Sequence, residues 1–304
     1  MFAAPQVIKT EVFAEVPQSL RKTDIPLERL AAGRGRPPAG CTLEGPSFDR
    51  AGNLYFVDNT YGRIFRADPS GQIEVIAEYD GEPNGLKLHK DGRIFVADYR
   101  HGIVTVDPAT GKVTPVVSRY MTDHFRGVND LVFSKNGDLY FTDQGQTDLA
   151  DPNGSVYCYS ADGKLRKVIG NAPSPNGLVF NLEEDILFVA TTRSNAIWRV
   201  PLTPSGAVSR LGVFLYLSGG VGPDGLALDE SGGLAIAHPG MGVVWVFSAR
   251  GEPLYRVESC RGDKPTNIAY GGPDRRTLYI MEAATGSILT ARLPSPGRAM
   301  YSHS

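Results

Sequence analysis

EGPSFDRAGNLYFVD, residues 44–58, contains two short apolar segments separated by a turn, and related stretches return five more times along the chain. Successive copies begin 40 to 48 residues apart, and each opens on Glu, Asn or Asp. The opening residues are Glu44, Asn84, Asn129, Asn176, Asp224 and, in a looser copy, Asn267. Short strands and Gly-containing turns repeated at this period are typical of the blades of a β-propeller.

Each repeat is predicted to contain four short antiparallel strands. In the first repeat these are EGPSFD, NLYFVD, RIFRAD and IEVIAEY, separated by turns rich in Asp, Asn, Gly and Pro. The six repeats therefore predict an all-β fold, a six-bladed β-propeller whose blades span residues 44–293. The sixth repeat lacks a fourth strand, and VIKTEVFAEVP, residues 7–17, is similar to the missing one. We expect this N-terminal strand to complete the last blade, because ring closure removes exposed sheet edges.

The whole chain, residues 1–304, is expected to form this single domain. Between the closing strand and the first blade lie residues 18–43, which include a weak helical signal, PLERLAAG (residues 26–33), and a segment rich in Pro and Gly. We expect residues 18–43 to form an arm over one face of the ring. Hydrophobic residues make up 41% of the chain, which is enough for the core of one large domain.

Composition excludes several kinds of partner. The net charge is −2 and no basic block stands out, so a nucleic-acid partner is not expected. No run of eighteen apolar residues occurs, and the first residues lack the pattern of a signal peptide. The three cysteines form no disulfide or zinc pattern. We therefore expect a cytoplasmic protein without a membrane partner, and the sequence does not indicate its oligomeric state.

The first strand of each blade lines the central channel of a propeller, so the six opening residues are expected to surround one mouth of it. The second strand is antiparallel to the first, and its end returns to the same mouth. In five of the repeats a polar residue ends this second strand, namely Asp58, Asp98, Asp143, His238 and Glu282. Carboxylates and carboxamides without a thiolate suit a hard divalent cation. A simpler interpretation is that Asn and Asp before Gly only form turns, and this interpretation is favoured for Asn84 and Asn267.

Four of the opening motifs, LEGPSFD, VNDLVF, SPNGLVF and GPDGLALD, occur in register with the blade period. In these motifs the chain resembles the senescence marker protein, regucalcin and gluconolactonase family of six-bladed propellers, which hydrolyse sugar lactones with a divalent metal. The resemblance implies that one divalent cation is held by Glu44, Asn129, Asn176 and Asp224. It also implies that Asp224 is catalytic, either as general base or as the group that orients the attacking water. An all-oxygen shell favours Ca²⁺, with Mg²⁺, Mn²⁺ and Zn²⁺ as alternatives.

Substrate contacts are less strongly indicated. The longest connections at the same mouth are residues 118–127 and 144–154, which makes them candidates for substrate selection. The candidate substrate-binding residues are Arg126, Gln144, Gln146, His238 and Asn84, and each has an alternative role in stabilising its own loop or strand. Family members that act on aldonolactones can carry Arg two residues before the Asn that corresponds to Asn129, whereas this chain has Gly127 there.

The sequence therefore predicts a metal-dependent lactonase that opens a small sugar-acid lactone, such as gluconolactone, or a related lactone. Serine-based hydrolysis finds no support, because the chain has no G-x-S-x-G motif. Two alternatives stay open. One is a phosphotriesterase that uses similar metal chemistry, and the other is a non-catalytic propeller that binds a ligand.

Overall fold

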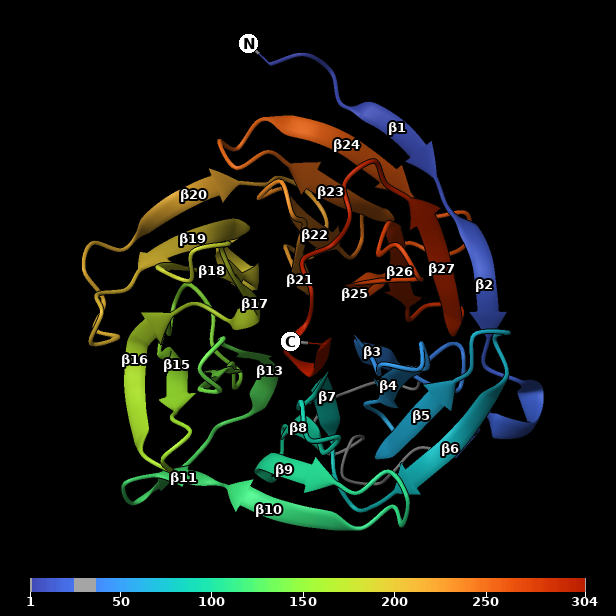
Figure 1. Ribbon diagram of the computed structural model, residues 1–304, viewed down its shortest axis with the longest axis horizontal. Helices are drawn as coiled ribbons and strands as arrows, with labels where there is room; N and C mark the ends of the chain where they lie inside the picture. The colour runs from blue at the N-terminus through green and yellow to red at the C-terminus, as the bar shows by residue number, and fades with distance from the viewer. Residues whose placement is uncertain (1, 25–36, 304) are drawn as a thin grey trace.

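The computed structural model describes residues 2–24 and 37–303, and it confirms the predicted six-bladed propeller (Figure 1). Six small antiparallel sheets surround a central channel, and each begins with its innermost strand. The predicted helical signal at residues 26–33 lies outside the described residues. Within the described part of the chain, no helix combines the length and apolarity of a membrane span.

The first three blades follow the repeat closely. Blade one contains β3 (Leu43–Phe48), β4 (Leu54–Asp58), β5 (Arg63–Ala67) and β6 (Ile73–Glu78). Blade two contains β7 (Pro83–Leu88), β8 (Ile94–Asp98), β9 (Gly102–Val106) and β10 (Val113–Val117). Blade three contains β13 (Val128–Phe133), β14 (Leu139–Asp143), β15 (Gly154–Tyr159) and β16 (Leu165–Ala172). A small hairpin of β11 (Arg119–Tyr120) and β12 (Asp123–His124) connects blades two and three.

The remaining blades have the same antiparallel order. Blade four contains β17 (Pro175–Phe180), β18 (Ile186–Thr191), β19 (Ala196–Pro201) and β20 (Gly212–Tyr216), with the short 3₁₀ helix η2 (Thr192–Ser194). Blade five contains β21 (Leu226–Leu228), β22 (Leu234–His238), β23 (Val243–Phe247) and β24 (Pro253–Glu258). Blade six contains β25 (Pro265–Gly271), β26 (Thr277–Glu282) and β27 (Ser287–Arg292).

The N-terminal segment closes the ring as predicted, but it does so with two strands instead of one. β2 (Glu11–Glu15) pairs antiparallel with β27 and is the fourth strand of blade six. β1 (Gln6–Lys9) pairs parallel with β24 and adds a fifth strand to blade five. Thr10 separates them, and its backbone and side chain both donate to the carbonyl of Glu258. The N-terminal segment therefore joins two blades at the outer edge of the ring (Figure 1).

The blades pack against one another through the side chains of their second strands. Every residue of β4, β8, β14 and β22 is buried, as expected for a strand covered on both faces. Around the channel the inner strands approach even more closely. A Cβ atom on Gly177 would lie 2.4 Å from the carbonyl oxygen of Asp224, so this contact between blades four and five requires glycine.

The described ends of the predicted arm pack on blade one. The 3₁₀ helix η1 (Gln18–Leu20) follows β2, and the carbonyl of Leu20 accepts a hydrogen bond from Arg63 at 2.6 Å. Arg63 also forms an ion pair of 2.6 Å with Asp58, and both side chains are almost fully buried. Asp58 accepts further hydrogen bonds from the backbone of Thr42 and Thr60. Burial raises the pKa of the Asp58 carboxyl, and the Arg63 guanidinium opposes that rise.

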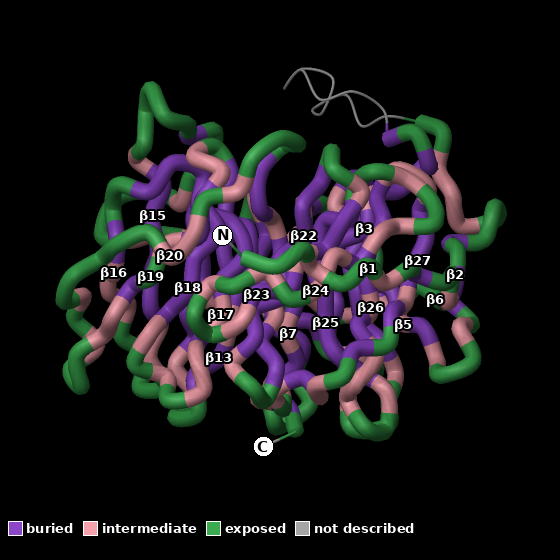
Figure 2. The backbone as a smooth tube through the Cα atoms, turned by 90° about the horizontal axis from the view of Figure 1, so that it is seen from above, coloured by how far each residue is buried: buried purple, intermediate pink, exposed green. Residues whose placement is uncertain are grey.

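The C-terminal tail, residues 294–303, crosses the mouth of the channel at which the inner strands end, a feature that the sequence did not predict (Figure 2). It hydrogen-bonds to blade five, where the backbone of Arg298 donates to Leu228, and to blade four, where the Arg298 side chain donates to Asn181. Tyr301, in the 3₁₀ helix η3 (Tyr301–His303), stacks on Phe133 of blade three. The tail ends on blade one, where the hydroxyl of Ser302 donates to Phe48.

Candidate active site

Four inner strands present the predicted metal ligands at one mouth of the channel. Glu44, Asn129 and Asn176 lie at the starts of β3, β13 and β17, and Asp224 lies just before β21. The first three are 6 to 7% exposed, while Asp224 is only partly buried. A backbone hydrogen bond of 2.9 Å from Asp224 to Ala237 of β22 fixes its position. The fold therefore brings all four side chains to the end of the channel where they were expected.

The carboxylates of this group act on one another. Burial and the neighbouring charge of Glu44 raise the pKa of Asp224 well above its ordinary value. Burial and the charge of Asp130 raise the pKa of Glu44 to about 8. These directions follow from placing like charges together in a region with little water. Hydrogen bonds from Asn176 to Asp224 and from Asn267 to Glu44 oppose the shifts.

Asn129 contributes an oxygen without a partner. Its carboxamide nitrogen donates to Oε1 of Gln144 at 3.2 Å, which fixes the orientation of the amide. The carboxamide oxygen, Oδ1, is buried and accepts no hydrogen bond. An unsatisfied buried acceptor costs about 1–3 kcal/mol unless something binds it. A ligand with positive charge or a hydrogen-bond donor is therefore expected at this oxygen.

This donor set fits a hard divalent cation. It offers two carboxylates and two amide oxygens, which Ca²⁺ and Mg²⁺ prefer, and no soft ligand. A cation would remove both unfavourable features of the group, because it would neutralise the clustered carboxylates and bind the free oxygen of Asn129. The described residues contain no group of three or more His, Cys, Asp or Glu side chains arranged to hold a metal, so the fit depends on the amides.

Asp130 is a third carboxylate that sequence reasoning missed. It is 3% exposed, and its Oδ2 accepts a hydrogen bond of 3.3 Å from Asn267, which belongs to blade six on the far side of the channel. Burial raises its pKa, and the charge of Lys87 opposes that rise. A signal was present in the sequence, because Gly follows the opening residue in four of the other five copies. Asp130 departs from that pattern.

The candidate substrate-binding residues differ in their exposure and in their hydrogen-bond partners. Gln144 lies directly beside Asn129, as its hydrogen bond shows. Gln146 and Arg126 are exposed and contact Tyr99 and Asn153, respectively. Asn84 donates to the backbone carbonyl of Asn129 at 3.1 Å, so it supports the neighbouring blade. Their contacts with substrate stay a prediction.

His238 has a clear structural environment. It is 1% exposed, and its Nε2 lies 3.0 Å from the carbonyl of Gly219. Its Nδ1 accepts a hydrogen bond from the Trp245 indole, which leaves the proton on Nε2. Burial lowers the pKa of the imidazole, so the neutral form is favoured. Both ring nitrogens are therefore engaged, one by blade five and the other by the connection between β20 and β21.

The acidic residues at the ends of the other second strands also stabilise the fold, because they accept hydrogen bonds from backbone N–H groups. Asp143 accepts hydrogen bonds from the backbone of Arg126 and Gly127, and Asp98 accepts them from Arg100 and His101. The carboxylate of Glu282 accepts hydrogen bonds from the backbone N–H groups of Lys264, Ala284 and Thr285. The carboxylate of Asp58 does the same for Thr42 and Thr60. These carboxylates hold the connections around the mouth, and the opening residues are left to face the channel.

The buried carboxylates at this mouth are expected to make the stability of the metal-free protein depend on pH. We expect its free energy of unfolding to fall as pH rises from about 4.5, the ordinary pKa of Glu44, to about 8, its pKa in the folded chain. In this range the folded chain keeps a proton that the unfolded chain has released, so higher pH favours unfolding. Urea unfolding in chelator at several pH values measures the effect. Glu44→Gln should make the pH dependence shallower, and an unchanged slope would contradict the assignment.

Most of the chain matches the model of a known protein family. The family model described as SMP-30/Gluconolactonase/LRE-like region matches residues 42–284. The chain therefore belongs to this family, as the opening motifs predicted. It is also similar to Lactonase drp35 from Staphylococcus aureus, with 31% identity over 230 residues that cover 72% of this chain and 70% of the relative. The corresponding protein of Staphylococcus epidermidis is 31% identical over 231 residues, with the same coverage.

Solved structures show the same fold. Regucalcin from Agrobacterium tumefaciens, described as a calcium-binding protein, aligns with a TM-score of 0.80 at 21% identity over 99% of this chain and 100% of its own. A gluconolactonase from Xanthomonas campestris aligns with a TM-score of 0.75 at 23% identity over 93% of this chain and 99% of its own. At these identities the likeness establishes the architecture.

Proposed function

We propose that this chain is a metal-dependent lactonase that opens a small sugar-acid lactone or a related lactone. The observation that carries the proposal is the buried, unpartnered oxygen of Asn129 at a mouth that also holds the carboxylates of Glu44 and Asp224. Membership of a family whose relatives are named lactonase and gluconolactonase supports the reaction class.

Glu44, Asn129, Asn176 and Asp224 would hold the cation, with Ca²⁺ as the leading candidate because all four donors are oxygens. A bound divalent cation polarises a carbonyl oxygen and lowers the pKa of a nearby water. Around it, Gln144 fixes the amide of Asn129, and Asn176 donates to the Asp224 carboxylate. These two hydrogen bonds would keep the donor oxygens in place before the cation binds.

Asp224 is the proposed general base. It is the only partly exposed member of the four, so a water molecule can reach it from the mouth. Its carboxylate accepts a proton as the water attacks the lactone carbonyl, and the hydrogen bond from Asn176 orients it for that transfer. Opening the ring breaks the bond between the acyl carbon and the ring oxygen, and this oxygen takes a proton to become the hydroxyl of a hydroxy acid.

Substrate choice would depend on the loops at the same mouth. Gln144 is the best placed candidate, because it contacts Asn129. Gln146 and Arg126 are exposed on loops beside it and would hydrogen-bond the hydroxyl groups of a sugar lactone. Asn84 is already engaged with the backbone of Asn129, so its contribution would be indirect.

A rate comparison tests the reaction class. Protein treated with EDTA and then supplied with Ca²⁺, Mg²⁺, Mn²⁺ or Zn²⁺ is assayed on aldonolactones, aromatic lactones and phosphotriesters. We expect lactone hydrolysis that disappears with EDTA and returns with at least one cation. Faster turnover of phosphotriesters than of every lactone would make the protein a phosphotriesterase, and no metal-dependent turnover on any panel would contradict an enzymatic function.

A further inference from the structure

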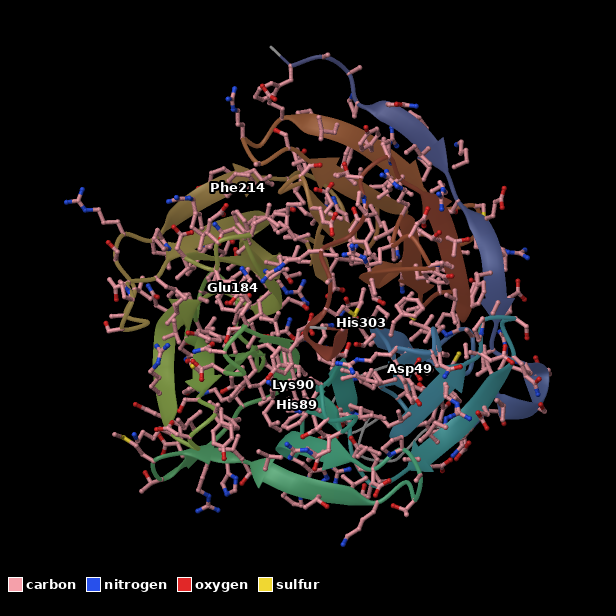
Figure 3. The ribbon with its side chains drawn as sticks, in the orientation of Figure 1. Asp49, His89, Lys90, Glu184, Phe214 and His303 are labelled. Carbon is pink, nitrogen blue, oxygen red and sulfur yellow. The ribbon has the colours of Figure 1, made fainter. Side chains whose placement is uncertain are left out.

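Contacts cross the channel near each of its two mouths. Near the metal-binding mouth, Asn267 of blade six donates to Asp130 of blade three, and this hydrogen bond crosses the channel. At the opposite mouth, the C-terminal tail crosses the ring. Figure 3 shows His303 of the tail near the channel axis, with Lys90, His89, Glu184 and Asp49 around it. A cavity of about 420 Å³ lies between the inner strands and this tail.

The cavity wall is mainly apolar. Val132, Val179 and Ala227, each the third residue after an opening residue, face it and are only partly buried. Leu88 and Leu226 complete the aliphatic surface, and Met300 of the tail covers one side. Neither the four proposed metal ligands nor Asp130 contributes to this wall. The cavity therefore does not share its wall with the proposed active site, and its volume lies within the range of small-molecule pockets.

Two lysines of the wall form no ion pair within the described residues. One of them, Lys135, is exposed and donates to the carbonyl of Leu182 at 2.8 Å. Arg298 forms an ion pair with Glu184, and Arg275 forms one of 2.6 Å with Glu230, so the acidic residues of the wall already have partners. Lys87 is half-buried, and its ammonium donates to the carbonyl of Leu86 at 3.1 Å. An ammonium has three donors, and within residues 2–24 and 37–303 no carboxylate forms a direct ion pair with Lys87.

An apolar cavity with a half-buried ammonium in its wall selects an amphiphilic anion. We propose that the cavity under the C-terminal tail is a second ligand site, which binds a small monocarboxylate with an apolar body, its carboxylate on Lys87 and its body against Val132, Val179 and Met300. Burial of the apolar body supplies affinity in proportion to its area. A charge-assisted hydrogen bond to Lys87 adds preference for the anion over a neutral molecule of the same shape.

Hexanoate is a suitable probe, with 1-hexanol as its neutral counterpart. Titration calorimetry of the full chain is expected to show one saturable hexanoate site and weaker binding of hexanol. Lys87→Met keeps an unbranched apolar side chain and removes the charge, so it should weaken hexanoate binding about tenfold or more and leave hexanol unchanged. Val179→Phe fills the cavity and should weaken both probes. Val132→Phe is a second filling variant, and near-UV circular dichroism checks that each variant is folded.

The results separate the proposal from its alternatives. Binding of hexanoate that survives both filling variants would place the ligand elsewhere and overturn the site. The role of Lys87 would be overturned if the wild-type protein bound hexanoate and hexanol equally tightly and Lys87→Met left both affinities unchanged. Absence of saturable binding in the wild-type protein would overturn the proposal entirely. None of these readouts depends on lactonase activity or on a bound metal.

Discussion

Asp224→Asn is expected to lower lactone turnover by roughly 100- to 1,000-fold, the scale on which loss of one electrostatic stabiliser affects catalysis. The substitution keeps the shape of the side chain but removes the charge that would bind the cation and the base that would accept a proton. The half-buried position of Asp224, beside Glu44 and Asn176, is the basis of this expectation. The measurement is kcat and KM on the best lactone of the panel, together with the affinity for Ca²⁺.

The matched control is Asp162→Asn, which makes the same change in the exposed turn between β15 and β16, away from the proposed active site. It should leave turnover and Ca²⁺ affinity within about twofold of the wild-type values, because an exposed carboxylate contributes little. Thermal unfolding shows whether the Asp224→Asn protein is folded. A folded Asp224→Asn protein with wild-type turnover would remove Asp224 from the catalytic assignment.

Asp58→Ala is expected to have the largest effect on stability, lowering the free energy of unfolding by about 3–5 kcal/mol. The substitution leaves the guanidinium of Arg63 buried without its partner, since Arg63 is 2% exposed. It also removes the acceptor for the backbone N–H groups of Thr42 and Thr60. Urea unfolding of the metal-loaded protein measures the change.

Asp91→Ala is the control for this prediction, because Asp91 also pairs with an arginine, Arg93, but on the surface. Its expected cost is under about 1 kcal/mol. Replacing both partners, in Asp58→Leu with Arg63→Met, should recover part of the lost stability, because no buried charge then remains. Equal costs for Asp58→Ala and Asp91→Ala would contradict the assignment of a buried ion pair.

The blades could be predicted from the sequence because each strand and turn is a local pattern. Alternating apolar residues and Gly-containing turns recur at a fixed period, and the period alone determines which residues open each inner strand. Glu44, Asn129, Asn176 and Asp224 could therefore be placed at one mouth without knowledge of any contact. The two-stranded N-terminal closure was only partly predicted, because the hydrogen bonds of Thr10 to blade five are not local.

The features that the sequence did not predict depend on contacts between distant segments. Asp130 faces Asn267 across the channel, 137 positions away in the chain, and nothing near either residue indicates the pair. The tail, residues 294–303, has no strand periodicity, and it is held by contacts such as Tyr301 on Phe133 and Arg298 on Asn181. His238 was assigned to the mouth from its strand position, and the partners of its ring nitrogens became visible only in the structure.

Lactone hydrolysis by this chain is proposed to require one divalent cation, held by four of the residues that open the inner strands. The most direct test of this requirement is a titration of metal-free protein with Ca²⁺, in which bound metal and turnover of the best lactone are measured on the same samples. We predict that activity rises in proportion to bound metal and reaches its maximum at one ion per chain, and that Glu44→Gln loses both together. Full activity in protein shown to be metal-free would contradict the proposal.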